Sequence, residues 1–268
     1  MGTSHRLVAA VRTKNEAWIL EPWLERTSQF VDGIIALDDG STDDSVRILK
    51  AHPKVLEVIQ KPLGGYWTEL VDRNRLLDVT RKYSPDWMFL IDPDEIMDAR
   101  LADRVDALLG DPEVGKHVFK EVTLWRGTEF YRVDHPEKYH RDVAAITAII
   151  RMNPALRWVP RQKYTWRGRV KNLLRGGRWL RVPNVGSERL VGVSGEMRIH
   201  QDLVKLHYHF VNWDRAWRTE MRYVVYRAIA TRTRLHEVES LVESMAHRLS
   251  EEGLELIPVD PRWGVISI

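Results

Sequence analysis

The chain has 268 residues, of which 44% are hydrophobic and 29% are charged, a balance typical of a globular protein with a full core. It has no cysteine, which excludes disulfides, thiolate catalysis and cysteine-ligated zinc. No apolar run is long enough to predict a transmembrane helix, and the first residues contain too short an apolar run for a signal peptide. We therefore expect a cytoplasmic protein.

The formal net charge is only +3, but the positive charge is concentrated in one part of the chain. Residues 143–187 contain ten Lys and Arg residues and no Asp or Glu. Within this stretch, residues 157–181 combine arginines with Trp158, Trp166 and Trp179. This segment predicts contact with an anionic partner. Three kinds of partner fit: a phosphate-bearing acceptor, a nucleic acid, or a membrane surface that the protein contacts peripherally. A solvated surface segment is an equally good interpretation.

Apolar segments alternate with helical patterns over the first 100 residues. Strands are predicted at residues 6–11, 33–37, 55–59 and 87–91, and helices from about residue 16, from about 40 to 49, and over 68–83. Continuous apolar strands separated by helices indicate an α/β fold with a mostly parallel sheet covered by helices on both faces. In such sheets, ligands bind beyond the carboxyl ends of the strands.

The remainder of the chain has weaker patterns. Residues 118–125 and 144–150 are predicted to be strands, and two helices close the chain. The first begins near Asp214 and places Trp217 and Val225 in its apolar face, and the second ends at Gly253. With no repeat and no low-complexity linker, the simplest expectation is one α/β domain over residues 1–268 with a helical C-terminal region.

Two acidic clusters follow predicted strands. In the sequence DPDE, Asp92 and Asp94 flank a proline, and two such carboxylates can bind one hard cation together with substrate phosphate oxygens. A surface turn that begins a helix explains this cluster equally well. In DDGSTDD, Asp38 and Asp39 end a buried strand, where a carboxylate can accept hydrogen bonds from a nucleobase or a ribose. Together, the clusters are consistent with a pocket for a nucleoside and a metal-bound diphosphate.

The runs VRTKNEAWILEPWLE…VDGIIALDDGSTDDS and WMFLIDPDE resemble GT-A-fold glycosyltransferases of the large family 2 type. The resemblance covers residues 6–100. It implies a GT-A-type, Rossmann-like fold with a nucleotide-binding half at residues 1–115 and an acceptor-side half at residues 116–268. It also implies a metal-dependent transferase that moves a sugar from a UDP- or GDP-sugar to an acceptor hydroxyl. The resemblance does not identify the acceptor; a glycan, a protein, a lipid-linked group and a nucleic acid are all open.

The resemblance assigns roles to residues of the nucleotide-binding half. Asn15 and Glu16 fall in the loop that lines the nucleotide site, Asp39 matches the residue that holds the base, and Arg73 is expected to approach the nucleotide. Asp92 and Asp94 match the Asp-x-Asp motif, which contacts the nucleotide and binds Mn²⁺ or Mg²⁺, and Asp94 is the more direct ligand.

Further along the chain, KLHYHF resembles an element that supplies a late metal ligand in many relatives. His207 aligns best, and His209 lies on the same side of a strand two residues later. An imidazole ligand shifts the preference from Mg²⁺ toward Mn²⁺. A histidine pair on a polar strand face is an equally good interpretation.

An inverting transfer requires a carboxylate that takes the proton from the acceptor hydroxyl. Glu188 is the candidate for this catalytic base, because it is the first acid after the acid-free stretch and lies in a segment that loosely resembles one in some relatives. Glu196, Asp202 and Asp134 stay open as alternatives, and a retaining transfer needs no such base.

Two other functions compete with a glycosyltransferase. A haloacid-dehalogenase-type phosphatase also carries Asp-x-Asp after a strand, but normally at the start of the chain and with Thr or Val where this chain has Ile96. A non-catalytic nucleic-acid-binding protein that uses residues 157–181 leaves both acidic clusters unexplained.

Overall fold

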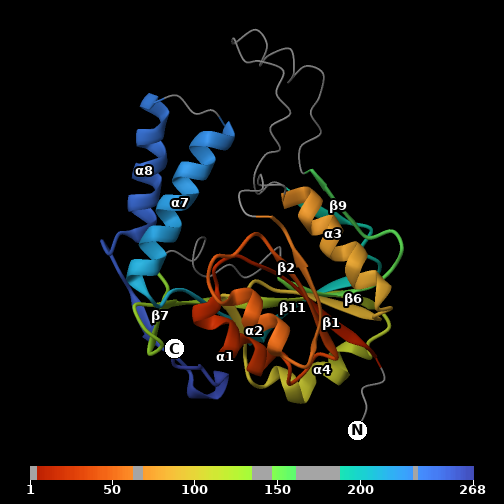
Figure 1. Cartoon of the computed structure of the whole chain (residues 1–268). Helices are drawn as coiled ribbons and strands as arrows, with labels where there is room; N and C mark the ends of the chain where they lie inside the picture. The colour runs from red at the N-terminus through yellow and green to blue at the C-terminus, as the bar shows by residue number, and fades with distance from the viewer. Residues whose placement is uncertain (1–4, 63–68, 135–146, 161–187, 232–234) are drawn as a thin grey trace.

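The computed structural model describes residues 5–62, 69–134, 147–160, 188–231 and 235–268 (Figure 1). In the described residues, a ten-stranded sheet forms the centre of the molecule, and two further strands pair in a separate small sheet. The strands of the large sheet are β1 (Leu7–Thr13), β2 (Gly33–Asp38), β3 (Val55–Gln60), β4 (Trp87–Leu90), β5 (Glu95–Met97), β6 (Val114–Trp125), β7 (Phe130–Arg132), β8 (Ala148–Arg151), β11 (Glu196–Phe210) and β12 (Leu256–Pro258). The small sheet pairs β9 (Arg157–Pro160) with β10 (Glu188–Val191).

The helices of the described residues are α1 (Ala17–Thr27), α2 (Ser45–Ala51), α3 (Glu69–Lys82), α4 (Leu101–Leu109), α7 (Trp213–Thr231) and α8 (Leu235–Leu249), with a short 3₁₀ turn, η1 (Pro261–Trp263). The predicted α/β class is confirmed. All four strands predicted in the first 100 residues are present and neighbour one another in parallel, in the order β3–β2–β1–β4.

Strand β1 shows why this half of the sheet is covered on both faces. Its side chains alternate between two apolar cores: Leu7, Ala9 and Val11 pack into one, and Val8 and Ala10 pack into the other. Residues of α1, α2 and α4 complete the first core, and residues of α3 complete the second. The sheet is therefore buried between helices, as its unbroken apolar strands predict.

The second half of the chain completes the same sheet with a different pattern. Strand β8 joins β4 and β6 in antiparallel pairs. Of the strand predicted at residues 144–150, residues 147–150 are described, and the observed strand begins at Ala148. Strand β11 runs parallel to β6 and antiparallel to the short β5. Because residue 115 falls inside β6, the two halves expected at residues 1–115 and 116–268 share one sheet.

The C-terminal helices stand side by side next to the sheet (Figure 1). Helix α7 packs through Ala216 and Val224 into a small core with residues of β6, β11 and α8. The predicted apolar face of this helix is wrong in part, because Trp217 and Val225 are 44% and 50% exposed. The buried stripe is thus rotated from the predicted one.

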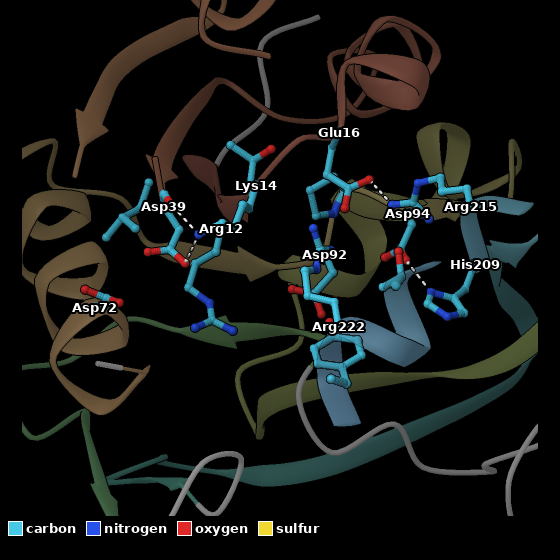
Figure 2. A pocket seen from close by; sticks show the side chains of 15 residues that line it. Arg12, Lys14, Glu16, Asp39, Asp72, Asp92, Asp94, His209, Arg215 and Arg222 are labelled. Atoms are coloured by element: carbon cyan, nitrogen blue, oxygen red, sulfur yellow. Dashed lines mark hydrogen bonds and ion pairs between the residues drawn. The ribbon is translucent and has the colours of Figure 1, made fainter. Parts of the chain in front are cut away.

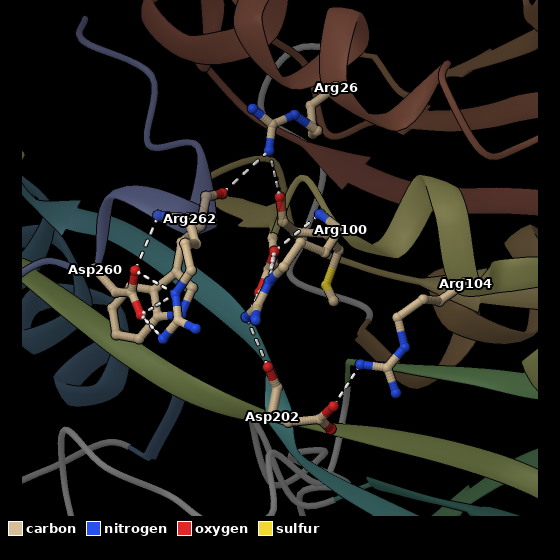
Figure 3. A network of polar contacts seen from close by, with 9 residues as sticks. Arg26, Arg100, Arg104, Asp202, Asp260 and Arg262 are labelled. Atoms are coloured by element: carbon tan, nitrogen blue, oxygen red, sulfur yellow. Dashed lines mark hydrogen bonds and ion pairs between the residues drawn. The ribbon is translucent and has the colours of Figure 1, made fainter.

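The C-terminal segment is attached to the centre of the molecule by polar contacts (Figure 3). The Arg26 guanidinium donates hydrogen bonds to the carbonyl oxygens of Met97, at 3.0 Å, and Gly264, at 2.6 Å. The backbone N–H of Ile266 donates to the Tyr208 hydroxyl at 2.9 Å. These bonds join α1, β5 and β11 to the end of the chain.

Among the described residues, no helix is both long enough and apolar enough to cross a membrane.

Candidate metal and nucleotide site

The Asp-Pro-Asp turn lies at the carboxyl end of β4, where the sequence predicted a ligand site. Strand β5 follows immediately and pairs with β11 so that Glu95 stands opposite His207. The turn is fixed at both ends, because the Asp92 N–H donates to the Glu95 carboxylate at 3.2 Å and the Asp94 carbonyl accepts from the Tyr208 N–H at 2.7 Å. This pairing brings Asp94 next to two histidines that are more than 100 residues away in sequence.

Asp94, His207 and His209 form a compact cluster in which one ligand atom from each residue lies within 4.8 Å of the others. The Asp94 Oδ2 atom is 3.6 Å from His207 Nε2 and 3.4 Å from His209 Nδ1, and Figure 2 shows Asp94 facing His209. Alternation along β11 explains the geometry: the polar side chains of residues 205, 207 and 209 share one side, while Leu206 and Tyr208 pack into the core. One carboxylate and two imidazoles make a donor set suited to Mn²⁺, Fe²⁺ or Zn²⁺.

Each histidine of the cluster has a second carboxylate at its outer nitrogen. Glu121 of β6 lies 3.5 Å from His207 Nδ1, and Glu220 of α7 lies 3.3 Å from His209 Nε2. Metal-binding histidines usually donate their other ring N–H to a carboxylate or carbonyl, which orients the ring and makes the bound nitrogen more basic. The cluster therefore has three side chains that could bind a cation and two further carboxylates that could orient the histidine rings.

The pKa values in the cluster indicate that it attracts positive charge. Burial acts to raise the pKa of Asp94, but the neighbouring His207 and His209 imidazoles outweigh it and hold that pKa well below its usual range. Burial acts to lower the pKa of each histidine, but Asp94 with Glu121 raises that of His207 well above its usual value, and Asp94 with Glu220 raises that of His209.

A buried ion-pair network lies beneath the cluster. The Lys205 ammonium contacts the carboxylate of Glu95 and is 2.9 Å from that of Glu121. The Thr147 hydroxyl donates to Glu95 and lies 3.3 Å from the lysine. Because Glu95 also holds the Asp92 N–H and Glu121 faces His207, this network supports both sides of the candidate site.

A pocket in front of the Asp-Pro-Asp turn combines acidic and basic side chains (Figure 2). Asp39, at the end of β2, lines the same pocket as Asp92 and Asp94, so the two acidic clusters meet as predicted from their strand ends. The pocket also contains His209, Asp72 and the basic residues Arg12, Lys14, Arg215 and Arg222.

The Asp39 carboxylate is held by two lysines, Lys61 at 2.6 Å and Lys14 at 3.4 Å. The side chain keeps 28% of its surface exposed, so it remains accessible from the pocket. Its position is compatible with the predicted contact to a nucleotide.

Glu16 lines the pocket and is bound from the side of the C-terminal helices. Its carboxylate accepts from Trp18 Nε1 at 2.6 Å and pairs with the Arg215 guanidinium, which stacks 4.0 Å from the Trp18 ring centre. Burial, followed by the charge of Asp94, raises the pKa of Glu16 to about 7. Arg215 thereby joins α7 to the loop after β1.

Besides His207 of the cluster, the predicted site residues Asn15, Arg73 and Glu188 do not line this pocket. Asn15 has a positive φ of 56° and accepts the Thr42 N–H at 2.7 Å, so it shapes the loop after β1. Arg73 is buried, pairs with Glu69 at 2.7 Å and stacks 4.7 Å from Trp158. Their expected nucleotide contacts stay predictions.

Glu188 begins β10 and does not line the pocket. Burial, followed by the charge of Glu69, raises its pKa. The alternatives do not line the pocket either: Asp134 pairs with Arg132, Asp202 pairs with Arg104, and Glu196 is exposed. A general-base role for any of them stays a prediction. Of the basic segment at residues 157–181, residues 161–181 lie outside the described residues.

Several residues of the site were not predicted from the sequence. Glu121 and Lys205 lie within strands, and Arg215, Glu220 and Arg222 lie on a helix whose face toward the pocket depends on how it packs. Only the two-residue spacing of Lys205, His207 and His209 could have indicated a shared polar side of β11.

No protein-family model matches the chain. It is 26% identical over 162 residues to uncharacterised proteins of Mycobacterium bovis and Mycobacterium tuberculosis. The match covers 58% of this chain and 37% of each relative, so the chain matches little more than a third of the relatives' length.

Solved structures similar to this chain include Staphylococcus aureus TarS, at 13% identity and a TM-score of 0.46 over 91% of this chain and 43% of that one. A second is the mannosyltransferase PcManGT from Pyrobaculum calidifontis in complex with GDP-Man and Mn²⁺, at 17% identity and a TM-score of 0.44 over 86% and 65%. A third is glucosyl-3-phosphoglycerate synthase from Mycobacterium tuberculosis with Mn²⁺ and UDP, at 21% identity and a TM-score of 0.35 over 44% of each chain. With TM-scores below 0.5, these similarities do not assign a function to this chain.

Proposed function

We propose that this chain is a metal-dependent glycosyltransferase that moves a sugar from a nucleoside-diphosphate sugar, with UDP or GDP as the nucleotide, to an acceptor hydroxyl. The observation that carries the proposal is the position of Asp94 between His207 and His209 at the carboxyl end of β4, in the same pocket as Asp39. This arrangement supports a carboxylate that binds the nucleoside next to a cluster that binds a cation.

Asp94, His207 and His209 would hold the cation, and Asp92 of the same turn would contribute directly or through water. The donor set fits Mn²⁺ better than Mg²⁺, because two imidazoles replace the oxygen ligands that Mg²⁺ prefers. A bound divalent cation acts as a Lewis acid that stabilises charge on the departing diphosphate.

The protein side chains have three tasks in this proposal. Glu121 and Glu220 orient the two histidine rings, and Lys205 with Glu95 fixes the turn that carries Asp92. Arg12, Lys14 and Arg222 line the pocket and attract the anionic donor. Asp39 accepts hydrogen bonds from the nucleoside, as its place at the end of β2 suggests.

The proposal is tested by measuring Mn²⁺-dependent nucleotide binding with calorimetry. The full chain is titrated with UDP and with GDP in the presence of Mn²⁺, Mg²⁺ or EDTA, and release of nucleotide from the matching sugar donors is then followed. We expect one nucleotide to bind with Mn²⁺ and not with EDTA, and Asp94→Asn to weaken this binding at least about tenfold, because one carboxylate ligand is lost.

Asp106→Asn is the matched control, since Asp106 is exposed on α4 and does not line the pocket. It should bind nucleotide as the wild type does. Absence of metal-dependent binding for both nucleotides would contradict the proposal. Phosphatase activity that is lost in Asp92→Asn would favour the haloacid-dehalogenase-type alternative.

A further inference from the structure

A second, open cavity of about 610 Å³ lies next to the pocket that contains the Asp-Pro-Asp turn. It is lined by the loop residue Asn15, by Asn212 and by one side of α7. Three residues, Arg215, Thr219 and Arg222, line both cavities. A ligand in the second cavity is therefore adjacent to whatever occupies the first.

The second cavity has an excess of positive charge. Its lining contains Arg215, Arg218 and Arg222, against the single carboxylate of Asp214. The spacing of the three arginines along α7 places them on one side of the helix. This differs from the first cavity, in which acidic residues are numerous.

The arginines of this cavity keep hydrogen-bonding capacity for a ligand. In the parts of the chain that the structure describes, neither Arg218 nor Arg222 forms an ion pair with a carboxylate. Arg215 pairs with Glu16 through Nη2, but its Nη1 atom is buried and has no hydrogen-bond partner among those residues. The guanidinium groups of Arg218 and Arg222 are therefore available to an anionic ligand in this cavity.

We propose that this cavity binds a phosphate ester on the acceptor substrate, an inference that rests on the proposed glycosyltransferase function. A transferase with an anionic donor and an anionic acceptor needs two separate sites for negative charge. The cation cluster serves the diphosphate, and the α7 arginines serve the acceptor phosphate, because a guanidinium fork matches the oxygens of a phosphate group. The residues shared by both cavities lie where the acceptor hydroxyl meets the donor sugar.

Arg218 makes the inference testable independently of the donor, because it lines the second cavity and not the first, and its side chain is exposed. Calorimetry on the wild type and Arg218→Gln uses glycerol 3-phosphate as the probe, with glycerol as the uncharged comparison. Titrations are made with and without saturating UDP and Mn²⁺. We expect binding of glycerol 3-phosphate but not glycerol, at least about tenfold weaker in Arg218→Gln, and unchanged binding of UDP with Mn²⁺.

A soluble metabolite and a lipid headgroup present the same phosphate ester, so a second arm measures co-sedimentation with phosphatidylcholine vesicles with and without phosphatidic acid. Arg75→Gln is the matched control, since Arg75 is an exposed arginine of α3 on a different cavity. The inference is supported if the wild type binds one of the two probes and this binding is weaker in Arg218→Gln but unchanged in Arg75→Gln. The probe that binds then shows whether the phosphate ester belongs to a soluble metabolite or to a lipid headgroup.

The inference is overturned if neither probe binds, or if Arg218→Gln and Arg75→Gln bind equally well. Failure of the proposed function looks different: the wild type then shows no Mn²⁺-dependent UDP or GDP binding, while the phosphate-ester titration without nucleotide still reports on the second cavity.

Discussion

Individual residues of the site differ in how well a sequence can predict them. Asp92 and Asp94 follow an apolar strand within one short motif, so their type and position indicate a cation site before the fold is known. His209 is found by the two-residue period of a strand once His207 is suspected. Glu121 and Glu220 carry no such local signal, because each is an ordinary acid in a strand or helix that reaches a histidine only after packing.

The role of Glu220 leads to a prediction for metal affinity. Glu220→Gln keeps the shape of the side chain but removes the charge that faces His209 Nε2, so the imidazole becomes a poorer ligand. We expect the affinity for Mn²⁺, measured by calorimetry, to fall about 10- to 100-fold, with little change in the thermal unfolding midpoint.

Glu239→Gln is the corresponding control, since Glu239 is exposed on α8. It should leave Mn²⁺ affinity unchanged. Equal affinities of Glu220→Gln and the wild type would show that the carboxylate has no part in metal binding.

At the scale of elements, β11 explains where sequence-based prediction stopped. Its last six residues were recognised, but the whole strand covers Glu196–Phe210 and crosses register shifts against β6. Residues of its first part are largely exposed, so no apolar alternation indicates a strand there. The strand joins β5 and β6 through polar contacts between distant segments, and such contacts leave no periodic signal.

Lys205 on β11 leads to a prediction for stability. Its buried ammonium faces the carboxylates of Glu95 and Glu121, and its removal in Lys205→Met leaves two buried acids without their cation. Breaking a buried ion pair by removing one partner costs about 3–5 kcal/mol, so we expect a loss of this size in the free energy of unfolding.

Chemical denaturation measures this loss, with Lys82→Met, an exposed lysine at the end of α3, as the control. The double variant Lys205→Met/Glu95→Gln should recover part of the stability, because one uncompensated charge is removed. A change below about 1 kcal/mol in Lys205→Met would mean that the network contributes little to folding.

For the whole molecule, the α/β class and the mostly parallel sheet of the first four strands could be predicted, because unbroken apolar strands between helices indicate both. Their order, β3–β2–β1–β4, comes from the structure. The way in which the second half completes the sheet could not be predicted, since β8 and β11 have weak apolar patterns and pair with strands far away in sequence. The contacts of the C-terminal segment with Arg26 were also missed, because they join a helix side chain to backbone carbonyls.

The joining of these distant strands leads to a prediction for the pH dependence of stability. His117 of β6 and His200 of β11 are buried, with His117 Nδ1 3.0 Å from His200 Nε2. This hydrogen bond needs one ring nitrogen without a proton. Burial, followed by the charges of His200 and Arg198, lowers the pKa of His117 to about 4.

The sign of the effect follows from proton binding. Between pH 6.5 and about 4, the unfolded chain binds a proton at His117 that the folded chain does not, so this residue makes stability fall as the pH falls. The full difference of one proton corresponds to about 1.4 kcal/mol per pH unit. Other groups act in the opposite direction, Glu16 among them because its pKa is raised by folding, so the slope of the wild type alone does not isolate His117.

The variant His117→Gln has no group that titrates at this position. We expect its free energy of unfolding, measured by chemical denaturation from pH 7 to 4.5, to fall less steeply than that of the wild type, by up to about 1.4 kcal/mol per pH unit. Two parallel curves would mean that His117 takes up a proton equally in both states, and that its contact with His200 survives protonation.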